Sequence, residues 1–188
     1  MRYNIRITTD RSISMELRKA LPQDFDSVKR FYWELIDDMQ GCKTFPKWSK
    51  GEYPSDDDLA KYIENGELYI AQSNGEIAGA FALNNCAPKG YESCDWLVKA
   101  PPEQVSVIHI LAVSAKQHHT GIGSYLVEQA KEICRKTGQR SLRLDVVDNN
   151  TPARNLYVKQ GFIPHKIIEL TYDNIGTLKF LLCEYPVK

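Results

Sequence analysis

The feature that most constrains this chain is a strand-like run that breaks into a glycine-rich turn and then into a helical pattern. The apolar run covers residues 108–113, the turn contains Gly121 and Gly123, and apolar side chains then recur at helical spacing as far as Gly138. A glycine turn at the start of a helix presents backbone N–H groups and the positive end of the helix dipole to an anion. The segment therefore predicts either a phosphate cradle or a tight strand-to-helix turn without a ligand.

Two common nucleotide-binding motifs do not fit this turn. A Walker loop requires a Gly-Lys-Ser/Thr sequence, which does not follow Gly123. The dinucleotide fingerprint requires a third glycine at the position of Leu126. The turn therefore does not favour a nucleoside triphosphate or a dinucleotide as its ligand.

Length and composition limit the class of protein. The chain has 188 residues, 43% of them hydrophobic, and we expect a single domain over residues 15–188 behind an N-terminal extension or strand over residues 1–14. Its 24 basic and 24 acidic side chains balance, so no sequence-wide charge attracts nucleic acid or an anionic membrane. Five scattered cysteines without a CxxC pair are typical of free thiols, and no apolar run has the length of a membrane span. We expect a cytoplasmic protein.

Apolar spacing and turn residues predict a mixture of strands and helices. The expected elements are a short strand at 16–20, a helix at 22–39, a helix after Ser55, strands at 68–72 and 77–83, an irregular stretch at 84–103, a strand at 105–113, a helix at 122–138, a strand at 141–147, a helix at 151–161, and strands at 167–171 and 178–184. Asn74-Gly75 predicts a tight hairpin turn. Thr151 is the expected N-cap of its helix, ahead of Pro152 at the first helical position.

Two further stretches have both a structural and a functional interpretation. The aspartates at 56–58 follow Ser55 with the spacing of a helix N-terminus and its capping box rather than that of a metal site. The loop at 44–54 contains the aromatic residues Phe45, Trp48 and Tyr53, which either line a pocket or pack into the core. We expect packing for these aromatic side chains and no metal site in the chain.

A second cluster follows one strand after the glycine turn and consists of Asn150, Ala153, Leu156, Tyr157, Gly161 and Phe162. Ala153 and Tyr157 are four residues apart, on one face of the expected helix. A small residue one turn before a tyrosine allows a ligand or a strand to approach closely. A phenol with a pKa of about 10 is a suitable proton donor to a leaving thiolate with a pKa of about 8.5. The alternative is that Tyr157 is an ordinary half-buried aromatic side chain.

At this spacing the two clusters resemble the motifs of the GCN5-related N-acetyltransferase (GNAT) superfamily. The later family motif, NxxAxxLYxxxGF, is matched in full over residues 150–162. The family's pyrophosphate loop, [RQ]xxGx[GA], is matched at Gly121 and Gly123, whereas His118 stands where Arg or Gln is expected and His119 where glycine is common. Because this loop acts mainly through backbone N–H groups, we expect it to retain phosphate binding.

The resemblance implies a mixed α/β (α+β) fold and a cofactor. The central sheet would be mostly antiparallel, with six to seven strands and about four flanking helices, and it would splay apart between the strands at 105–113 and 141–147. The cofactor would be acetyl-CoA, acting as co-substrate, with its pyrophosphate on the glycine turn and its pantetheine arm beside the preceding strand. The implied cofactor contacts are Leu111, Ala112, Val113, His118, His119, Thr120, Gly121, Ile122, Gly123, Ser124, Asn150 and Tyr157.

The reaction that the resemblance implies is direct attack of a neutral amine on the thioester. Tyr157 would protonate the departing CoA thiolate, and a base must accept the proton of the ammonium. The candidates for the base are His109, whose reference pKa of about 6.5 suits neutral pH, and Glu103. A histidine between isoleucines also fits a packed core side chain. We do not expect Cys94 or Cys134 to act as a nucleophile, because the first lacks an evident partner and the second lies on an apolar helix face.

The expected activity is the transfer of the acetyl group from acetyl-CoA to a primary amine of a small molecule or peptide. The alternative is a non-catalytic acyl-CoA sensor or interaction module with the same fold. The resemblance is compatible with a homodimer in either case.

Overall fold

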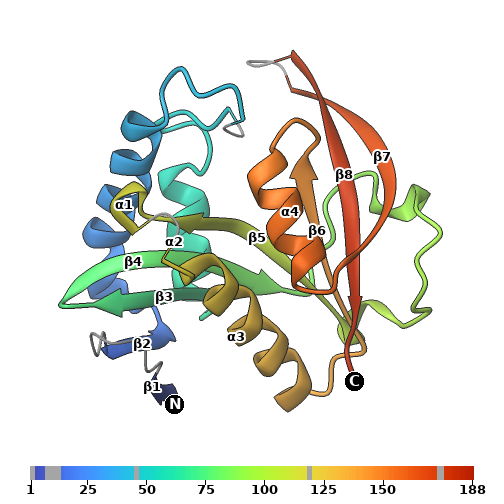
Figure 1. Cartoon of the computed structure of the whole chain (residues 1–188), viewed down its shortest axis with the longest axis horizontal. Coiled ribbons are helices and arrows are strands. Elements are labelled where there is room, and N and C mark those ends of the chain that lie inside the picture. The colour runs from blue at the N-terminus through green and yellow to red at the C-terminus, as the bar shows by residue number, and fades with distance from the viewer. Residues whose placement is uncertain (1–2, 7–13, 45–46, 118–119, 173–175) are drawn as a thin grey trace. The chain divides into compact units, whose positions relative to one another are not determined.

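The computed structural model describes residues 3–6, 14–44, 47–117, 120–172 and 176–188 (Figure 1). The strands are β1 (Tyr3–Arg6), β2 (Ser14–Lys19), β3 (Leu68–Ser73), β4 (Glu76–Asn84), β5 (Val105–Val113), β6 (Ser141–Val147), β7 (Ile163–Tyr172) and β8 (Gly176–Pro186). The helices are α1 (Phe25–Asp38), α2 (Asp56–Glu64), α3 (Ile122–Lys136) and α4 (Thr151–Lys159). The expected order of elements is confirmed from β2 onward, and β1 is a short strand within residues 1–14, where an extension or a strand was expected.

The strands hydrogen-bond in the order β1-β2-β3-β4-β5-β6-β8-β7. The β5–β6 pair is parallel, whereas the pairs β1–β2, β2–β3, β3–β4, β6–β8 and β7–β8 are antiparallel. The predicted fold is therefore confirmed as a mixed, mostly antiparallel sheet with four helices. Strands β2 to β8 are the seven expected ones.

The parallel pair β5–β6 is short. Its register joins Val105–Val107 to Ser141–Arg143. Beyond these residues β5 continues to Val113 and β6 to Val147, and no further pair between the two strands is found in the described part of the chain. β6 meanwhile stays paired with β8 over its whole length. The predicted splay between the two strands stays a prediction, because residues 109–113 of β5 and all of β6 belong to different units.

The chain folds into two compact units. The first contains residues 1–40, 48–83 and 109–126, and the second contains residues 41–47, 84–108 and 127–188. β5 and α3 each contribute residues to both units. The single domain expected over residues 15–188 stays a prediction.

In the first unit, β4 approaches β5 and α3 closely at Gly79. A Cβ atom added to Gly79 would lie 2.8 Å from Cδ1 of Leu126 and 3.0 Å from the carbonyl oxygen of Ala112. Both distances are shorter than ordinary van der Waals contacts, and the carbonyl belongs to the backbone and cannot rotate away. A glycine at this position therefore lets α3 pack directly on the sheet.

Two local signals in the first unit are confirmed. The β3–β4 hairpin turns at Asn74 and Gly75, whose φ angles of 53° and 83° are those of the expected two-residue turn. At the start of α2, Oγ of Ser55 accepts a hydrogen bond from the N–H of Asp58 at 3.1 Å. The Asp58 carboxylate accepts one from the N–H of Ser55 at 2.9 Å. The aspartates thus begin a helix with a capping box.

One helix end differs from its prediction. The N-cap of α4 is Asn150 rather than Thr151, and its side chain accepts a hydrogen bond from the N–H of Ala153 at 3.2 Å. The helix therefore begins one residue earlier than expected, and Pro152 occupies its second position. Asn and Thr are both good N-caps, so residue type alone does not decide between these neighbours.

The aromatic loop after α1 is only partly packed. Trp48 is half-buried, with its ring centroid 5.9 Å from that of the buried Tyr32. Tyr53 lies 6.3 Å from Trp48 and is 45% exposed. The packing prediction holds for Trp48 and is wrong for Tyr53, whereas Phe45 lies outside the described residues. The two rings meet edge to face, so Trp48 covers little of the surface of the tyrosine ring.

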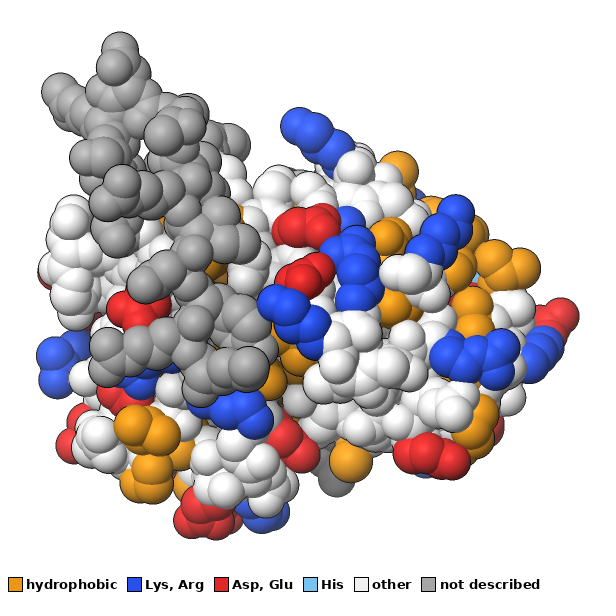
Figure 2. Space-filling view, turned by 90° about the horizontal axis from the view of Figure 1, so that it is seen from below, with side chains coloured by type: hydrophobic (Ala, Val, Ile, Leu, Met, Phe, Trp, Pro, Cys, Tyr) orange, Lys and Arg blue, Asp and Glu red, His pale blue; other side chains and the backbone are white. Residues whose placement is uncertain are grey.

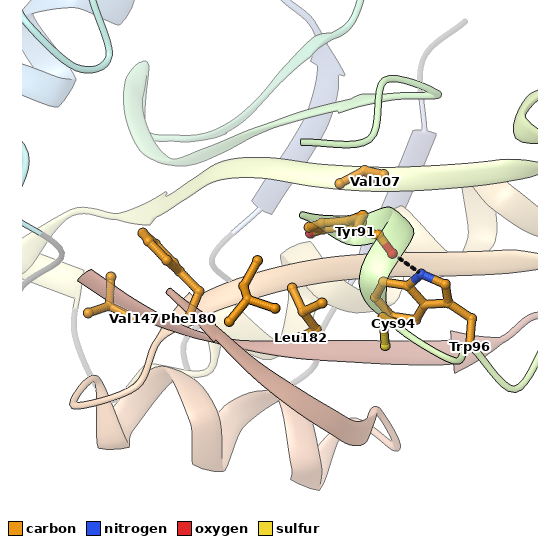
Figure 3. Packing of buried hydrophobic residues seen from close by; sticks show 8 residues of the cluster. Tyr91, Cys94, Trp96, Val107, Val147, Phe180 and Leu182 are labelled. Carbon is orange, nitrogen blue, oxygen red and sulfur yellow. Dashed lines mark hydrogen bonds between the residues drawn. The ribbon is translucent and has the colours of Figure 1, made fainter. Parts of the chain in front are cut away.

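The core of the second unit lies between the sheet and the irregular stretch that precedes β5 (Figure 3). The ring centroids of Tyr91 and Trp96 are 5.3 Å apart, and Nε1 of Trp96 donates a hydrogen bond to the Tyr91 carbonyl at 2.9 Å. The strands contribute buried side chains from Val107, Val147, Ile168, Phe180 and Leu182. The irregular stretch is therefore one wall of a core rather than an open loop.

A fully buried carboxylate, that of Glu184 on β8, fastens this stretch to the sheet. It accepts hydrogen bonds from the backbone N–H groups of Leu97 and Val98 at 2.8 and 3.2 Å. It also accepts from Oγ of Ser141 at 2.7 Å and from Nε of Arg143 at 3.1 Å. Four donors, one of them charged, compensate for the burial of the carboxylate.

The distribution of charged side chains on the surface and the lengths of the helices bear on two expectations from the composition. On the face that Figure 2 shows, basic side chains lie next to acidic and hydrophobic ones, as the balanced composition leads one to expect. In the described part of the chain, no helix combines the length and the apolar character that crossing a membrane requires.

Candidate active site

The predicted cofactor strand is the second half of β5, in the first unit. Of residues 111–113, the middle one is buried and the outer two are half-buried. The N–H of Ser114 donates a hydrogen bond to the Ala78 carbonyl at 3.0 Å, which joins the end of β5 to β4. Just before this segment, Ile110 has a φ of 46°, in the left-handed region that β-branched residues avoid. The backbone of β5 thus changes direction where the predicted cofactor contacts begin.

The glycine turn in the first unit fits an anionic group. Gly121 has a φ of 89°, and a Cβ atom added to it would meet no atom of the described residues within 4 Å. α3 then begins at the buried Ile122, followed by the half-buried Gly123 and Ser124. The first N–H groups of a helix have no acceptor within the helix, and the helix dipole adds positive potential at the same point. The left-handed conformation of the turn therefore favours glycine, and the start of α3 has the N–H groups and the potential that suit an anion.

The residues before the turn are described only in part. Thr120 is exposed, and its Oγ1 donates a hydrogen bond to the Gln117 carbonyl at 2.6 Å. His118 and His119 lie outside the described residues. Their expected cofactor contacts stay predictions.

Tyr157 lies on α4, in the second unit, and is 6% exposed. Its ring packs against Phe162, with the centroids 5.7 Å apart. Burial raises the pKa of its hydroxyl well above the ordinary value, and the nearby ionisable groups of Asp145 and Cys183 raise it further. The hydroxyl therefore carries its proton at neutral pH, as a proton donor must.

Other residues of the same motif have structural roles. Gly161 has a φ of 82° and ends α4, and an added Cβ atom would lie 3.6 Å from the Tyr185 ring. Phe162 is 2% exposed and packs between Tyr157 and Tyr185. The side-chain oxygen of Asn150 serves as the N-cap of the helix. The motif thus fixes both ends of the helix that carries the tyrosine, and the expected cofactor contact of Asn150 stays a prediction.

The two bases expected from the sequence lie in different surroundings. His109 is half-buried on β5, and its ring stacks on that of Tyr62 with the centroids 5.9 Å apart. Glu103 is exposed in a 3₁₀ turn, and its backbone carbonyl accepts a hydrogen bond from the side-chain amide of Gln139 at 3.2 Å. Both interpretations of His109 therefore stay open. Stacking on an aromatic ring is compatible with a packed core side chain and also with a base whose ring is fixed in position.

The sequence reasoning missed a carboxylate close to Tyr157. Asp145 lies on β6, and its Oδ1 accepts a hydrogen bond from the hydroxyl of the buried Tyr91 at 2.8 Å. Burial raises the pKa of Asp145, although the hydrogen bond from Tyr91 lowers it. The available signal was an aspartate within residues 144–147, the otherwise apolar end of the strand, where a buried acidic side chain needs a partner.

The buried cysteines do not have the properties of nucleophiles. Burial raises the pKa of Cys134 to about 11 and also raises that of Cys94. Both thiols are therefore protonated at neutral pH, whereas the thiolate is the reactive form.

The predicted site residues thus fall into two groups. The first unit contains His109, residues 111–113 and the described part of the turn, residues 120–124. The second unit contains Asn150 and Tyr157, and it brings the missed Asp145 near Tyr157.

Comparison with known proteins gives a consistent result. The model of the acetyltransferase (GNAT) family matches residues 29–162, which is more than half of the chain. The uncharacterized N-acetyltransferase YvbK of Bacillus subtilis is 29% identical over 124 residues, which cover 64% of this chain and 70% of that protein. The uncharacterized N-acetyltransferase MJ1207 of Methanocaldococcus jannaschii is 30% identical over 157 residues, which cover 81% of this chain but less than two thirds, 62%, of the relative.

Solved structures share the fold. An acetyltransferase of the GNAT family from Streptococcus agalactiae has a TM-score of 0.75 at 19% identity, covering 93% of this chain and 96% of its own. The yncA protein of Salmonella typhimurium, solved with its cofactor acetyl-CoA, has a TM-score of 0.66 at 14% identity, covering 93% and 94%. With the family motif complete and the fold confirmed, the chain belongs to the acetyltransferase (GNAT) family and is an enzyme that uses acetyl-CoA as its acyl donor.

Proposed function

We propose that the protein transfers the acetyl group of acetyl-CoA to a primary amine of a small molecule or peptide by direct attack of the amine on the thioester. The α3 turn would bind the pyrophosphate through backbone N–H groups, and residues 111–113 would pair with the pantetheine arm. Tyr157 would protonate the CoA thiolate as it leaves. The observation that carries this proposal is a complete motif at 150–162, with the Tyr157 hydroxyl buried and protonated at its centre.

Steady-state kinetics with a panel of amines tests the proposal. The purified protein is mixed with acetyl-CoA and each amine in turn, and thiol release and the mass of the amine are followed together. We expect thiol release that depends on the amine, with one acetyl group added to the amine for each thiol formed. Binding of acetyl-CoA in a calorimeter without amine-dependent thiol release would contradict the proposal.

The proton acceptor has two candidates, His109 from the sequence and Asp145 from the structure. The amine nitrogen and the leaving sulfur are attached to the same carbon during the attack, so the groups that serve them must lie near one another. Asp145 is near enough to Tyr157 for its charge to raise the pKa of that hydroxyl. This proximity, within one unit, is the observation that favours the carboxylate.

Replacing Asp145 by Asn is expected to lower kcat by about 10²-fold, the lower end of what a positioned base contributes. A base must be ionised, so wild-type activity should fall as the pH drops through the pKa of Asp145, which burial raises from its ordinary value. The residual activity of the variant should lack this acidic limb. A pH profile of kcat for both proteins provides the measurement.

Asp145→Asn should lower kcat but raise the stability of the folded protein at neutral pH. A raised pKa in the folded state means that this carboxyl contributes stability below its unfolded pKa, and that the contribution disappears as the pH rises through the folded pKa. The variant should therefore melt at a higher temperature than the wild type at neutral pH. Asp148→Asn, three residues further along, is the matched control and should leave kcat unchanged. A larger loss of kcat in His109→Gln than in Asp145→Asn would return the role to the histidine.

A further inference from the structure

We infer that Tyr32, a residue of α1 far from the family motifs, is a positioning residue that holds β5 in the shape needed for acetyl-CoA. The inference rests on the proposed function, because it concerns the strand that would pair with the pantetheine arm. Two observations support it: the left-handed backbone conformation of Ile110 in that strand, and the buried hydrogen bond from the Tyr32 hydroxyl to the Ile110 carbonyl.

The outlier is Ile110, with a φ of 46° in the middle of a strand. Its β-branched side chain is crowded against the backbone in the left-handed region, so this conformation is strained. Such strain persists only where the surroundings enforce it. Ile110 is 6% exposed, and it lies between His109 and the predicted cofactor contacts at 111–113.

The enforcing contact comes from the hydroxyl of Tyr32. It donates a hydrogen bond to the Ile110 carbonyl at 2.8 Å, between residues 78 positions apart in the sequence. Tyr32 is fully buried, and burial raises the pKa of its hydroxyl well above the ordinary value, so the donor keeps its proton. Its ring is held by Phe31 and Trp48, with centroid distances of 5.1 and 5.9 Å.

The consequence for β5 follows from backbone geometry. One left-handed residue rotates the peptide planes on its two sides relative to each other, so the N–H and C=O directions of residues 111–113 depend on the conformation of Ile110. Without the bond from Tyr32, the Ile110 carbonyl would be buried without this partner, and the residue would relax toward ordinary extended backbone. The strand would then present its hydrogen-bonding groups in other directions.

Tyr32→Phe tests this inference, because it deletes the hydroxyl and keeps the ring. We expect the dissociation constant for acetyl-CoA, measured by calorimetry, to rise about tenfold, which is roughly the worth of one hydrogen bond to a buried carbonyl. We also expect the amide ¹H and ¹⁵N shifts of residues 111–113 to change in the ligand-free protein. The matched control is Val28→Ala, a fully buried position one turn earlier on α1 whose side chain has no hydrogen-bonding group.

The control separates positioning from general loss of stability. Val28→Ala should unfold at lower denaturant concentration and still bind acetyl-CoA within about twofold of the wild type. Unchanged binding in Tyr32→Phe, or an equal loss of binding in Val28→Ala, would overturn the inference. If instead the wild-type protein transfers no acetyl group to any amine, the proposed function fails, and the amide shifts of Tyr32→Phe still decide whether the hydroxyl controls the strand.

Discussion

Replacing Tyr157 by Phe is expected to lower kcat by about 10³-fold while changing the dissociation constant for acetyl-CoA by no more than about twofold. The change deletes the proton that the departing thiolate would take, and positioned acids contribute factors of about 10²–10⁴. The buried ring keeps its contact with Phe162, so the helix should remain folded. Stopped-flow thiol detection gives kcat, and calorimetry gives the binding constant.

The chain offers a matched control for this substitution in Tyr185. Its ring lies on the other side of Phe162, at a centroid distance of 5.7 Å, and its hydroxyl accepts a hydrogen bond from Arg135 at 3.3 Å. Tyr185→Phe therefore deletes a hydroxyl from the same stack of rings without touching the proposed acid. It should retain kcat. If Tyr157→Phe also retains kcat, Tyr157 is not the proton donor, and solvent water is left to protonate the thiolate.

Replacing Glu184 by Ala is expected to lower the free energy of unfolding by about 3–5 kcal/mol, the usual cost of breaking a buried ion pair from one side. Arg143 would keep its charge beside an empty space, although its guanidinium also lies 4.2 Å from the Trp96 ring centroid and donates to the Val98 carbonyl at 2.9 Å. His165 would lose the carboxylate that lies 3.3 Å from its Nε2. Urea unfolding followed by tryptophan fluorescence measures the loss.

Two further variants test whether the loss of stability in Glu184→Ala comes from an unpaired buried charge. Removing both charges, as in Arg143→Met with Glu184→Leu, should cost less than Glu184→Ala alone, because no charge is left buried without its partner. The exposed pair of Lys99 and Asp95 is the surface control, and Asp95→Ala should change the stability by less than about 0.5 kcal/mol. A loss of similar size in Glu184→Ala and Asp95→Ala would show that the buried carboxylate is not an anchor.

Local signals predicted much of the fold and part of the candidate site. The capping box at Ser55, the hairpin at Asn74-Gly75 and the motif at 150–162 depend on residues close together in the sequence, and the structure has the first two as expected. The N-cap of α4 was misplaced by one residue because two capping residues stand side by side. The conformation of Gly121 likewise follows from its place between a strand and a helix.

The missed features all depend on distant partners. Asp145 meets Tyr91 across 54 positions, Glu184 meets Ser141 across 43, and Tyr32 meets Ile110 across 78. A polar residue in an apolar strand indicates that it has a hydrogen-bonding partner. Which residue is the partner depends on the tertiary fold. For this reason Asp145, as a candidate proton acceptor, and the strained strand emerged only from the structure.

The hydrogen bonds between Glu184 and the irregular stretch have a consequence for which substitutions this stretch tolerates. The carboxylate holds the backbone N–H groups of Leu97 and Val98, which are the same for every residue except proline, and the Leu97 side chain is 61% exposed. Substitutions at position 97 other than proline therefore leave the anchor in place. The stretch can acquire new surface chemistry while the strands beneath it stay unchanged.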